Sequence, residues 1–159
     1  MIIYFLRHGL AGDWSEWHDD DVLRPLTEEG NQKMARVAET IARLNLGLDL
    51  IITSPLVRAF QTAEIVTKRL NLKGKLIQDE RLSPGFDRVK LEKILGEYPE
   101  VENILVVGHE PDFSQTISAL IGGGRVICKK GGLARVNVTN RSPLQGELVW
   151  LVPPRLLIS

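Results

Sequence analysis

Short apolar runs alternate along this chain with stretches whose apolar residues recur at helical spacing. Residues 2–6 and 104–107 form uninterrupted apolar runs, and residues 48–53 form a third strand-length segment that is mostly apolar. Runs of this length without polar alternation are typical of strands that are buried on both faces of a sheet. Their alternation with helices predicts an α/β layered domain with a largely parallel sheet.

Capping residues and apolar stripes predict where the helices lie. Thr27 is a plausible cap, with Glu28 and Glu29 in the first turn where the helix dipole favours negative charge. We expect this helix to bury one stripe and to end at Gly47. The stripe consists of Met34, Val37, Ala38, Ile41 and Leu44. The remaining predictions are a helix opening directly at Ser54-Pro55, a strand at 75–78, helices at 91–98 and 111–121, and a hairpin of 134–138 with 148–152.

Length and composition indicate an ordinary globular protein. The chain has 159 residues, of which 43% are hydrophobic and 25% charged, so we expect one domain spanning residues 1–159. Lys plus Arg and Asp plus Glu both number 20, which leaves no global field to attract nucleic acid or a membrane. The apolar run before Arg7 and His8 is too short for a signal peptide or a membrane span. With one cysteine, Cys128, and no zinc-site spacing, we expect a cytoplasmic protein without a metal or other cofactor.

Polar clusters follow three of the predicted strands. Arg7-His8-Gly9 follows the first strand, Arg58 lies in the first turn after the second, and His109 follows residues 104–107. Carboxyl ends of parallel strands share one edge of a sheet, so these side chains should meet there. Arginine forks and helix N-termini suit a phosphoryl group, and a neutral histidine is a competent nucleophile. The residues therefore favour phosphoryl transfer through a phosphohistidine intermediate on one of the two histidines, without a metal for charge.

Three motifs of the chain resemble the signatures of the histidine phosphatase superfamily and appear in the same order. They are Leu6-Arg7-His8-Gly9, the segment from Ser54 to Ala63 (SPLVRAFQTA), and Val106-Val107-Gly108-His109. The resemblance implies the phosphoglycerate mutase-like fold, which is a three-layer α/β/α sandwich. It also implies that His8 accepts the phosphoryl group. Arg7, Arg58 and His109 would then bind the equatorial oxygens and stabilise the loose transition state.

Finer features resemble the SixA-like group of bacterial phosphohistidine phosphatases within that superfamily. These features are Arg24-Pro25-Leu26-Thr27, the small size and the lack of a large inserted lid. The resemblance implies a metal-independent, monomeric enzyme that removes phosphate from phosphohistidine on a protein, such as a phosphotransfer domain or a phosphocarrier. Arg24 becomes a further substrate-binding candidate at the pocket mouth.

One departure from the superfamily bears on the substrate. Many relatives carry a glutamate proton donor after the third strand, whereas this chain places Ser83 or Pro84 there. Expelling an alkoxide without an acid is difficult, but an imidazole leaving group is a far weaker base. The departure therefore favours a P–N substrate. One alternative is a small-molecule phosphomonoesterase in which Glu80 or Asp87 donates the proton, and another is a phosphate or phosphoprotein-binding module without catalysis.

The loop after the first strand carries Trp14, Trp17 and the run from His18 to Asp21. Consecutive residues rarely converge on one ion, so we interpret the run as a solvated loop and not as a metal site. The two tryptophans either pack on the domain or form a platform beside the pocket for a protein substrate. For Cys128 we expect a buried, inert thiol, because Arg135 lies one residue too late for a Cys-x5-Arg phosphatase loop.

Overall fold

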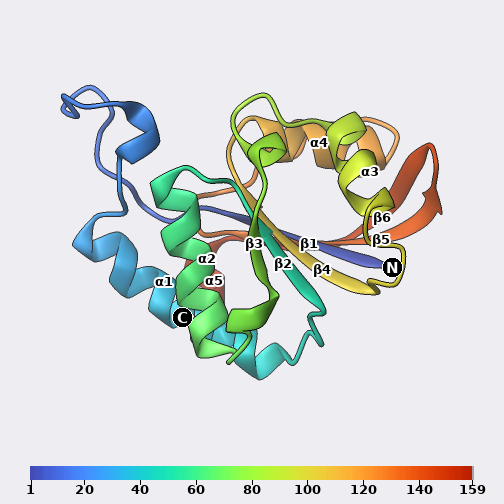
Figure 1. Cartoon of the computed structure of the whole chain (residues 1–159), viewed down its shortest axis with the longest axis horizontal. Coiled ribbons are helices and arrows are strands. Elements are labelled where there is room, and N and C mark those ends of the chain that lie inside the picture. Colours follow the sequence, from blue (N-terminus) through green and yellow to red (C-terminus); the bar gives the residue numbers. More distant parts are fainter. Residues whose placement is uncertain (159) are drawn as a thin grey trace.

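The computed structural model describes residues 1–158, which form a six-stranded sheet with helices on both faces (Figure 1). The strand order is β3-β2-β4-β1-β5-β6. Pairings between β1, β2, β3 and β4 are parallel, and β5 and β6 extend the sheet antiparallel. The strands are β1 (Ile2–Arg7), β2 (Leu50–Thr53), β3 (Leu76–Gln78), β4 (Asn103–Gly108), β5 (Leu133–Arg141) and β6 (Leu144–Val152). The predicted α/β class with a largely parallel sheet is confirmed.

Two apolar clusters, one on each face of the sheet, hold the layers together. Along β1, Ile3 and Phe5 belong to the cluster on one face, and Tyr4 and Leu6 to the other. This alternation follows from the period of two in a strand. The first face is covered by α3 (Arg88–Gly96) and α4 (Asp112–Leu120), and the second by α1 (Glu28–Leu44) and α2 (Val57–Arg69), with α5 (Pro154–Leu157) against α1. The three-layer α/β/α arrangement is therefore confirmed.

Helix α1 begins as predicted but ends earlier. The hydroxyl of Thr27 accepts a hydrogen bond from the Gly30 amide at 2.9 Å, which caps the first turn. The predicted stripe is buried except for Leu44, which is 46% exposed. The helix ends at Leu44 because Asn45 takes the left-handed conformation, with φ 49°. Our assignment of the end to Gly47 is therefore wrong, since the short polar side chain of Asn45 already permits that conformation.

Other element boundaries also differ from prediction. Helix α2 begins at Val57 and not at Pro55, because the Ser54 hydroxyl accepts from the Leu56 amide in a turn before the helix. Asp87 accepts from the Lys90 amide and starts α3 three residues before the predicted position. The hairpin strands β5 and β6 are longer than the apolar runs that predicted them, because their outer parts alternate with polar residues.

Short 3₁₀ turns occupy three of the connections between the main elements. They are η1 (Asp21–Leu23), η2 (Lys73–Lys75) and η3 (Glu80–Leu82). The first of these lies in the segment between β1 and α1, which stands out from the body of the molecule (Figure 1). Within residues 1–158, no helix has both the length and the apolar character needed to cross a membrane.

Candidate active site

The three polar clusters meet where β1, β4 and β2 end. Arg7 pairs with Gly108 in the sheet, and the His8 amide donates to the Gly108 carbonyl at 3.0 Å. The amide of Ser54 similarly donates to the carbonyl of Val107 at 3.0 Å. The His8 and His109 rings consequently lie with their centroids 5.3 Å apart. The expected convergence at one edge of the sheet is found in the structure.

An open pocket of about 500 Å³ lies at this edge. All five residues that we singled out from the sequence line it, namely Arg7, His8, Arg24, Arg58 and His109. The pocket wall also includes Asp13, Trp14, Pro84, Glu110 and Lys130, together with Leu10, Ala11 and Gly12. The structure therefore brings the candidate residues together, and their roles stay predictions.

The His8 ring is held in one orientation. Its Nδ1–H donates to the Gly9 carbonyl at 2.7 Å, and since a carbonyl only accepts, the lone pair of a neutral ring is on Nε2. Burial lowers the pKa of His8 to about 3, with further lowering from the nearby cations, so the ring is neutral at pH 7. The next residue, Gly9, packs closely against Met34, because a Cβ at position 9 would lie 2.5 Å from Met34 Cγ.

The His109 ring is held in place by a hydrogen bond at Nε2, whereas the His8 ring is held at Nδ1. The Nε2 atom of His109 lies 2.7 Å from the Ser54 hydroxyl oxygen. That oxygen accepts from the Leu56 amide at 3.2 Å, which leaves the hydroxyl proton free to be donated to Nε2. Burial, followed by the charge of Arg58, lowers the pKa of His109 to about 4. The Nδ1 atom is buried without a hydrogen-bond partner in the described part of the chain. When Ser54 donates its proton to Nε2, this Nδ1 carries a proton that it can offer to an anion.

The guanidinium of Arg58 is buried, and both of its terminal nitrogens are hydrogen-bonded to Asp21. Nη1 donates to the Asp21 carbonyl at 2.8 Å and Nη2 donates to Asp21 Oδ2 at 3.0 Å. Asp21 Oδ1 accepts from Arg24 Nε at 2.9 Å, and Arg24 Nη1 donates to the Gly12 carbonyl at 2.6 Å. These arginines, Arg24 first, lower the pKa of Asp21, so this carboxylate is ionised at neutral pH. Burial lowers the pKa of Arg58 from its ordinary value.

Arg7 is held by the segment that precedes β5. Its Nη1 donates to the Cys128 carbonyl at 3.0 Å. The Cys128 amide donates to the Ser114 hydroxyl at 3.0 Å, and that hydroxyl donates to Glu110 Oε2 at 2.5 Å. Burial raises the pKa of the Cys128 thiol to about 11, which agrees with the expectation of a buried, inert thiol. A chain of hydrogen bonds from Glu110 to Arg7 therefore sets the position of this guanidinium.

The pocket collects hydrogen-bond donors around the predicted nucleophile, His8. The Nε atoms of Arg7 and Arg58 and the Nδ1 atom of His109 are buried without partners among residues 1–158. Buried polar groups normally find a partner, and an anion with several oxygens would supply acceptors to this set of cationic and imidazole groups. A tetrahedral phosphoryl group beside the Nε2 lone pair of His8 fits these properties.

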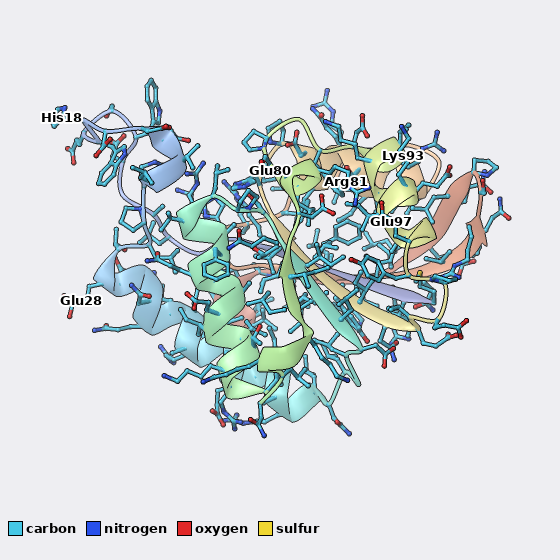
Figure 2. All side chains as sticks on the ribbon, in the orientation of Figure 1. His18, Glu28, Glu80, Arg81, Lys93 and Glu97 are labelled. Carbon is cyan, nitrogen blue, oxygen red and sulfur yellow. The ribbon has the colours of Figure 1, made fainter. Side chains whose placement is uncertain are left out.

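The carboxylates at the pocket are not the two, Glu80 and Asp87, that the sequence suggested as proton donors for a phosphomonoesterase. Neither Glu80 nor Asp87 lines the pocket: both are exposed, and Asp87 caps α3. Figure 2 shows Glu80 on the turn that leads to α3, well apart from His18 at the outer end of the projecting segment. The pocket carboxylates are instead Asp13, which accepts from Ser15, and Glu110, whose two oxygens both accept from Ser114.

The segment from His18 to Asp21 forms no metal site with its neighbours. Asp20 accepts from the Val22 amide and caps η1, while Asp21 pairs with two arginines. Across residues 1–158, three or more His, Cys, Asp or Glu side chains nowhere gather as metal ligands would. Sequence reasoning did not identify Asp21 as the partner of Arg58 and Arg24, because a carboxylate in an acidic run is usually solvated.

Comparison with known proteins agrees with this chemistry. The profile of the histidine phosphatase superfamily (branch 1) matches residues 3–84, just over half of the chain. An uncharacterized protein of Picosynechococcus sp. is 32% identical over 99% of both chains, and phosphohistidine phosphatase SixA of Escherichia coli K12 is 28% identical over 77% of this chain and 76% of its own.

Solved structures extend the likeness to the fold. A protein histidine phosphatase SixA complexed with tungstate superposes with a TM-score of 0.87 at 26% identity, covering 99% of each chain. A mycobacterial glucosyl-3-phosphoglycerate phosphatase has the same fold, with a TM-score of 0.74 at 18% identity over 96% of this chain and 99% of its own. The second similarity bears on the fold alone.

Proposed function

Because this chain belongs to the histidine phosphatase superfamily and has a SixA-like structure, we propose that it hydrolyses phosphohistidine on a protein substrate through an intermediate on His8. The observation that carries the proposal is the state of His8: a buried, neutral ring with its Nε2 lone pair available, beside Arg7 and Arg58. Similarity to SixA, a phosphohistidine phosphatase by name, supports the substrate class.

The first step transfers the phosphoryl group. Nε2 of His8 attacks phosphorus, a new N–P bond forms, and the P–N bond to the substrate imidazole breaks. Arg7, Arg58 and the Nδ1–H of His109 stabilise the charge on the equatorial oxygens. The departing ring takes a proton from solvent on its remote nitrogen and leaves as neutral imidazole, whose conjugate acid has a pKa of about 6.5, so no strong acid is needed in the pocket.

The second step regenerates His8. A water molecule attacks phosphorus, the bond to Nε2 breaks, and inorganic phosphate leaves with the water oxygen. The open pocket admits water and also a side chain presented on a protein surface. The Nδ1–H bond to Gly9 fixes the ring through both steps, which keeps Nε2 directed at the same phosphorus atom.

The disposition of carboxylates supports a P–N substrate. Asp21 is ionised and occupied by two arginines, and both oxygens of Glu110 accept from Ser114. Asp13 also lines the pocket, as does Glu110, so a small phosphate ester is the second candidate substrate. In that case one of these two carboxylic acids would protonate the leaving oxygen.

Metal-free hydrolysis of two substrates tests the proposal. A protein phosphorylated on histidine and para-nitrophenyl phosphate are offered in EDTA to the native chain and to His8→Ala. We expect fast turnover of phosphohistidine, weak turnover of the ester and loss of both in the variant. Strong ester hydrolysis that needs His8, without phosphohistidine turnover, would favour the second candidate, and turnover unaffected by His8→Ala would exclude both.

A further inference from the structure

The segment between Gly12 and Arg24 forms an arm beside the pocket, which we define as residues 13–23. None of its residues is buried, and it stands out from the body of the molecule (Figure 1). Trp14 is 74% exposed, and Val22 and Leu23 at the base of the arm are also exposed. Several large apolar side chains exposed on one short segment are typical of an interaction surface.

A hollow on the arm adjoins the candidate active site. It has a volume of about 530 Å³ and is lined by Trp14, Ser15, Trp17, Asp19, Asp21 and Arg24. Trp14 and Arg24 line both this hollow and the pocket that contains His8. A group bound at His8 and a second group of the same substrate can therefore occupy the two spaces together.

The arm is strongly acidic although the whole chain is neutral. Five of its eleven residues are Asp or Glu, and none is Lys or Arg. Arg24, the one cation on the hollow, is already bonded to Asp21 and to the Gly12 carbonyl. Two indole rings with carboxylates beside them attract a cation through both the ring faces and the negative charge.

Hydrogen bonds order the backbone of the arm in the absence of a partner. The indole N–H of Trp17 donates to the Asp20 carbonyl at 2.9 Å, and the Asp13 carboxylate accepts from the Ser15 hydroxyl at 2.7 Å. At its base, Asp21 is bonded to the buried Arg58. Because these contacts already order the backbone, docking on the arm loses less conformational entropy than docking on a mobile loop.

From these features we propose that the arm recognises a Lys or Arg side chain of the substrate protein, next to its phosphorylated histidine. The cationic side chain enters the hollow between Trp14, Trp17 and Asp19 while the phosphoryl group lies at His8. The proposal deepens the proposed function and rests on it for the identity of the phosphorylated residue. Of the two interpretations of Trp14 and Trp17 given by the sequence, the proposal favours a platform for a protein substrate over packing on the domain.

Paired peptides test the arm. Two phosphohistidine peptides of equal length carry either Lys or Glu beside the phosphorylated residue, and phosphoramidate is the small reference substrate. For the native chain we expect the KM of the Lys peptide to be about five- to tenfold lower than that of the Glu peptide, the range of one exposed cation–π contact with charge pairing. Asp19→Asn/Asp20→Asn keeps the oxygen acceptors of the arm but should remove most of this difference, without changing turnover of phosphoramidate.

Matched controls separate a local effect from a general one. Glu100→Gln removes an exposed carboxylate elsewhere and should keep the difference between the peptides. Trp14→Ala should raise the KM of the Lys peptide more than that of phosphoramidate. Equal KM values for the two peptides with the native chain, or equal losses in the arm variant and Glu100→Gln, would overturn the proposal.

A binding measurement keeps the proposal testable if the proposed function fails. Both peptides are prepared with a hydrolysis-resistant phosphonate analogue of phosphohistidine, and their affinities for His8→Ala are measured by calorimetry. If neither phosphohistidine peptide is hydrolysed by the native chain, the proposed function is wrong. A preference for the Lys analogue would still support the arm as a cation site, and equal affinities would reject it.

Discussion

Asp21 holds both terminal nitrogens of Arg58, through its backbone carbonyl at 2.8 Å and its Oδ2 atom at 3.0 Å. The two residues differ in environment, because the Arg58 side chain is 6% exposed and the Asp21 side chain is 55% exposed. An exposed segment thus sets the orientation of a guanidinium in the candidate active site. This contact also links the arm to Arg58, which we predict to bind the phosphoryl group.

Asp21→Asn should lower kcat/KM for phosphohistidine by about tenfold, since even a small misplacement of Arg58 weakens transition-state stabilisation. Asp21→Glu, which retains the charge, should recover part of the loss. Steady-state kinetics and the inhibition constant of inorganic phosphate measure the effect. A higher kcat/KM with tighter phosphate binding in Asp21→Asn would show instead that Asp21 competes with the phosphoryl group for Arg58.

Ser54→Ala should lower kcat about tenfold with little change in KM. The variant leaves Nε2 of His109 without its partner, so the proton is no longer directed to Nδ1 for donation to the phosphoryl oxygens. Ser54→Thr keeps a hydroxyl and serves as the matched control. Kinetics and thermal unfolding of the three proteins separate the effects: a loss of stability with native kcat would contradict the assignment of Ser54 as a positioning residue.

Ser114→Ala should raise the KM for phosphohistidine and lower stability by about 1–3 kcal/mol, because the buried Cys128 amide loses its acceptor. The Cys128 carbonyl then no longer holds Arg7 in place. Ser118→Ala on the same helix removes a hydroxyl that donates to the Gly124 carbonyl, outside this network. Urea unfolding and kinetics of both variants check the prediction, which fails if Ser118→Ala shows the same rise in KM.

The pKa values predict how activity depends on pH. His8 and His109 have pKa values of about 3 and about 4, so both are neutral from pH 8 down to pH 5. Protonation of His8 removes the nucleophilic lone pair, hence kcat/KM should be level over this range and fall below about pH 4. A pH profile, corrected for spontaneous hydrolysis, measures this. A fall centred near pH 6.5 would mean that His8 titrates as an ordinary histidine.

The same values predict a loss of stability in acid. Above pH 6.5 each histidine is neutral in both the folded and the unfolded chain and contributes nothing. Between about pH 6.5 and 4 the unfolded chain binds protons that the folded chain does not. The free energy of unfolding therefore decreases as the pH is lowered, by roughly 1.4 kcal/mol per pH unit for each histidine at most. Urea unfolding of the native chain and of His8→Asn/His109→Asn at pH 7, 5.5 and 4.5 should show a shallower decline in the variant.

The convergence of Arg7, Arg58 and His109 on His8 was predictable from sequence because it depends on one rule, that parallel strands end at one edge of a sheet. The residues that support them follow no such rule. Arg7 is held by the backbone carbonyl of Cys128. Every residue has such a carbonyl, so the amino-acid sequence does not indicate which one accepts from Arg7. Asp21 lies in a run of three aspartates, and only the path of the arm distinguishes it from its neighbours.

The fold itself was predicted best where packing alone decides it. The continuous apolar runs in β1 and β4 are buried on both faces, and their positions are correct within a residue or two. Helix ends are set by local backbone contacts, such as the left-handed Asn45 or the Asp87 cap, which compete with equally plausible signals nearby. Those ends were accordingly missed by two or three residues.

A rapid-quench single turnover with a ³²P-phosphohistidine protein in EDTA tests the central claim most directly. We predict that label appears on the native chain within one turnover, is stable to alkali, maps to His8 and then decays into inorganic phosphate. His8→Ala should acquire no label, whereas Asp21→Asn should acquire it more slowly. Release of phosphate without a labelled enzyme, or label on a residue other than His8, would contradict the mechanism.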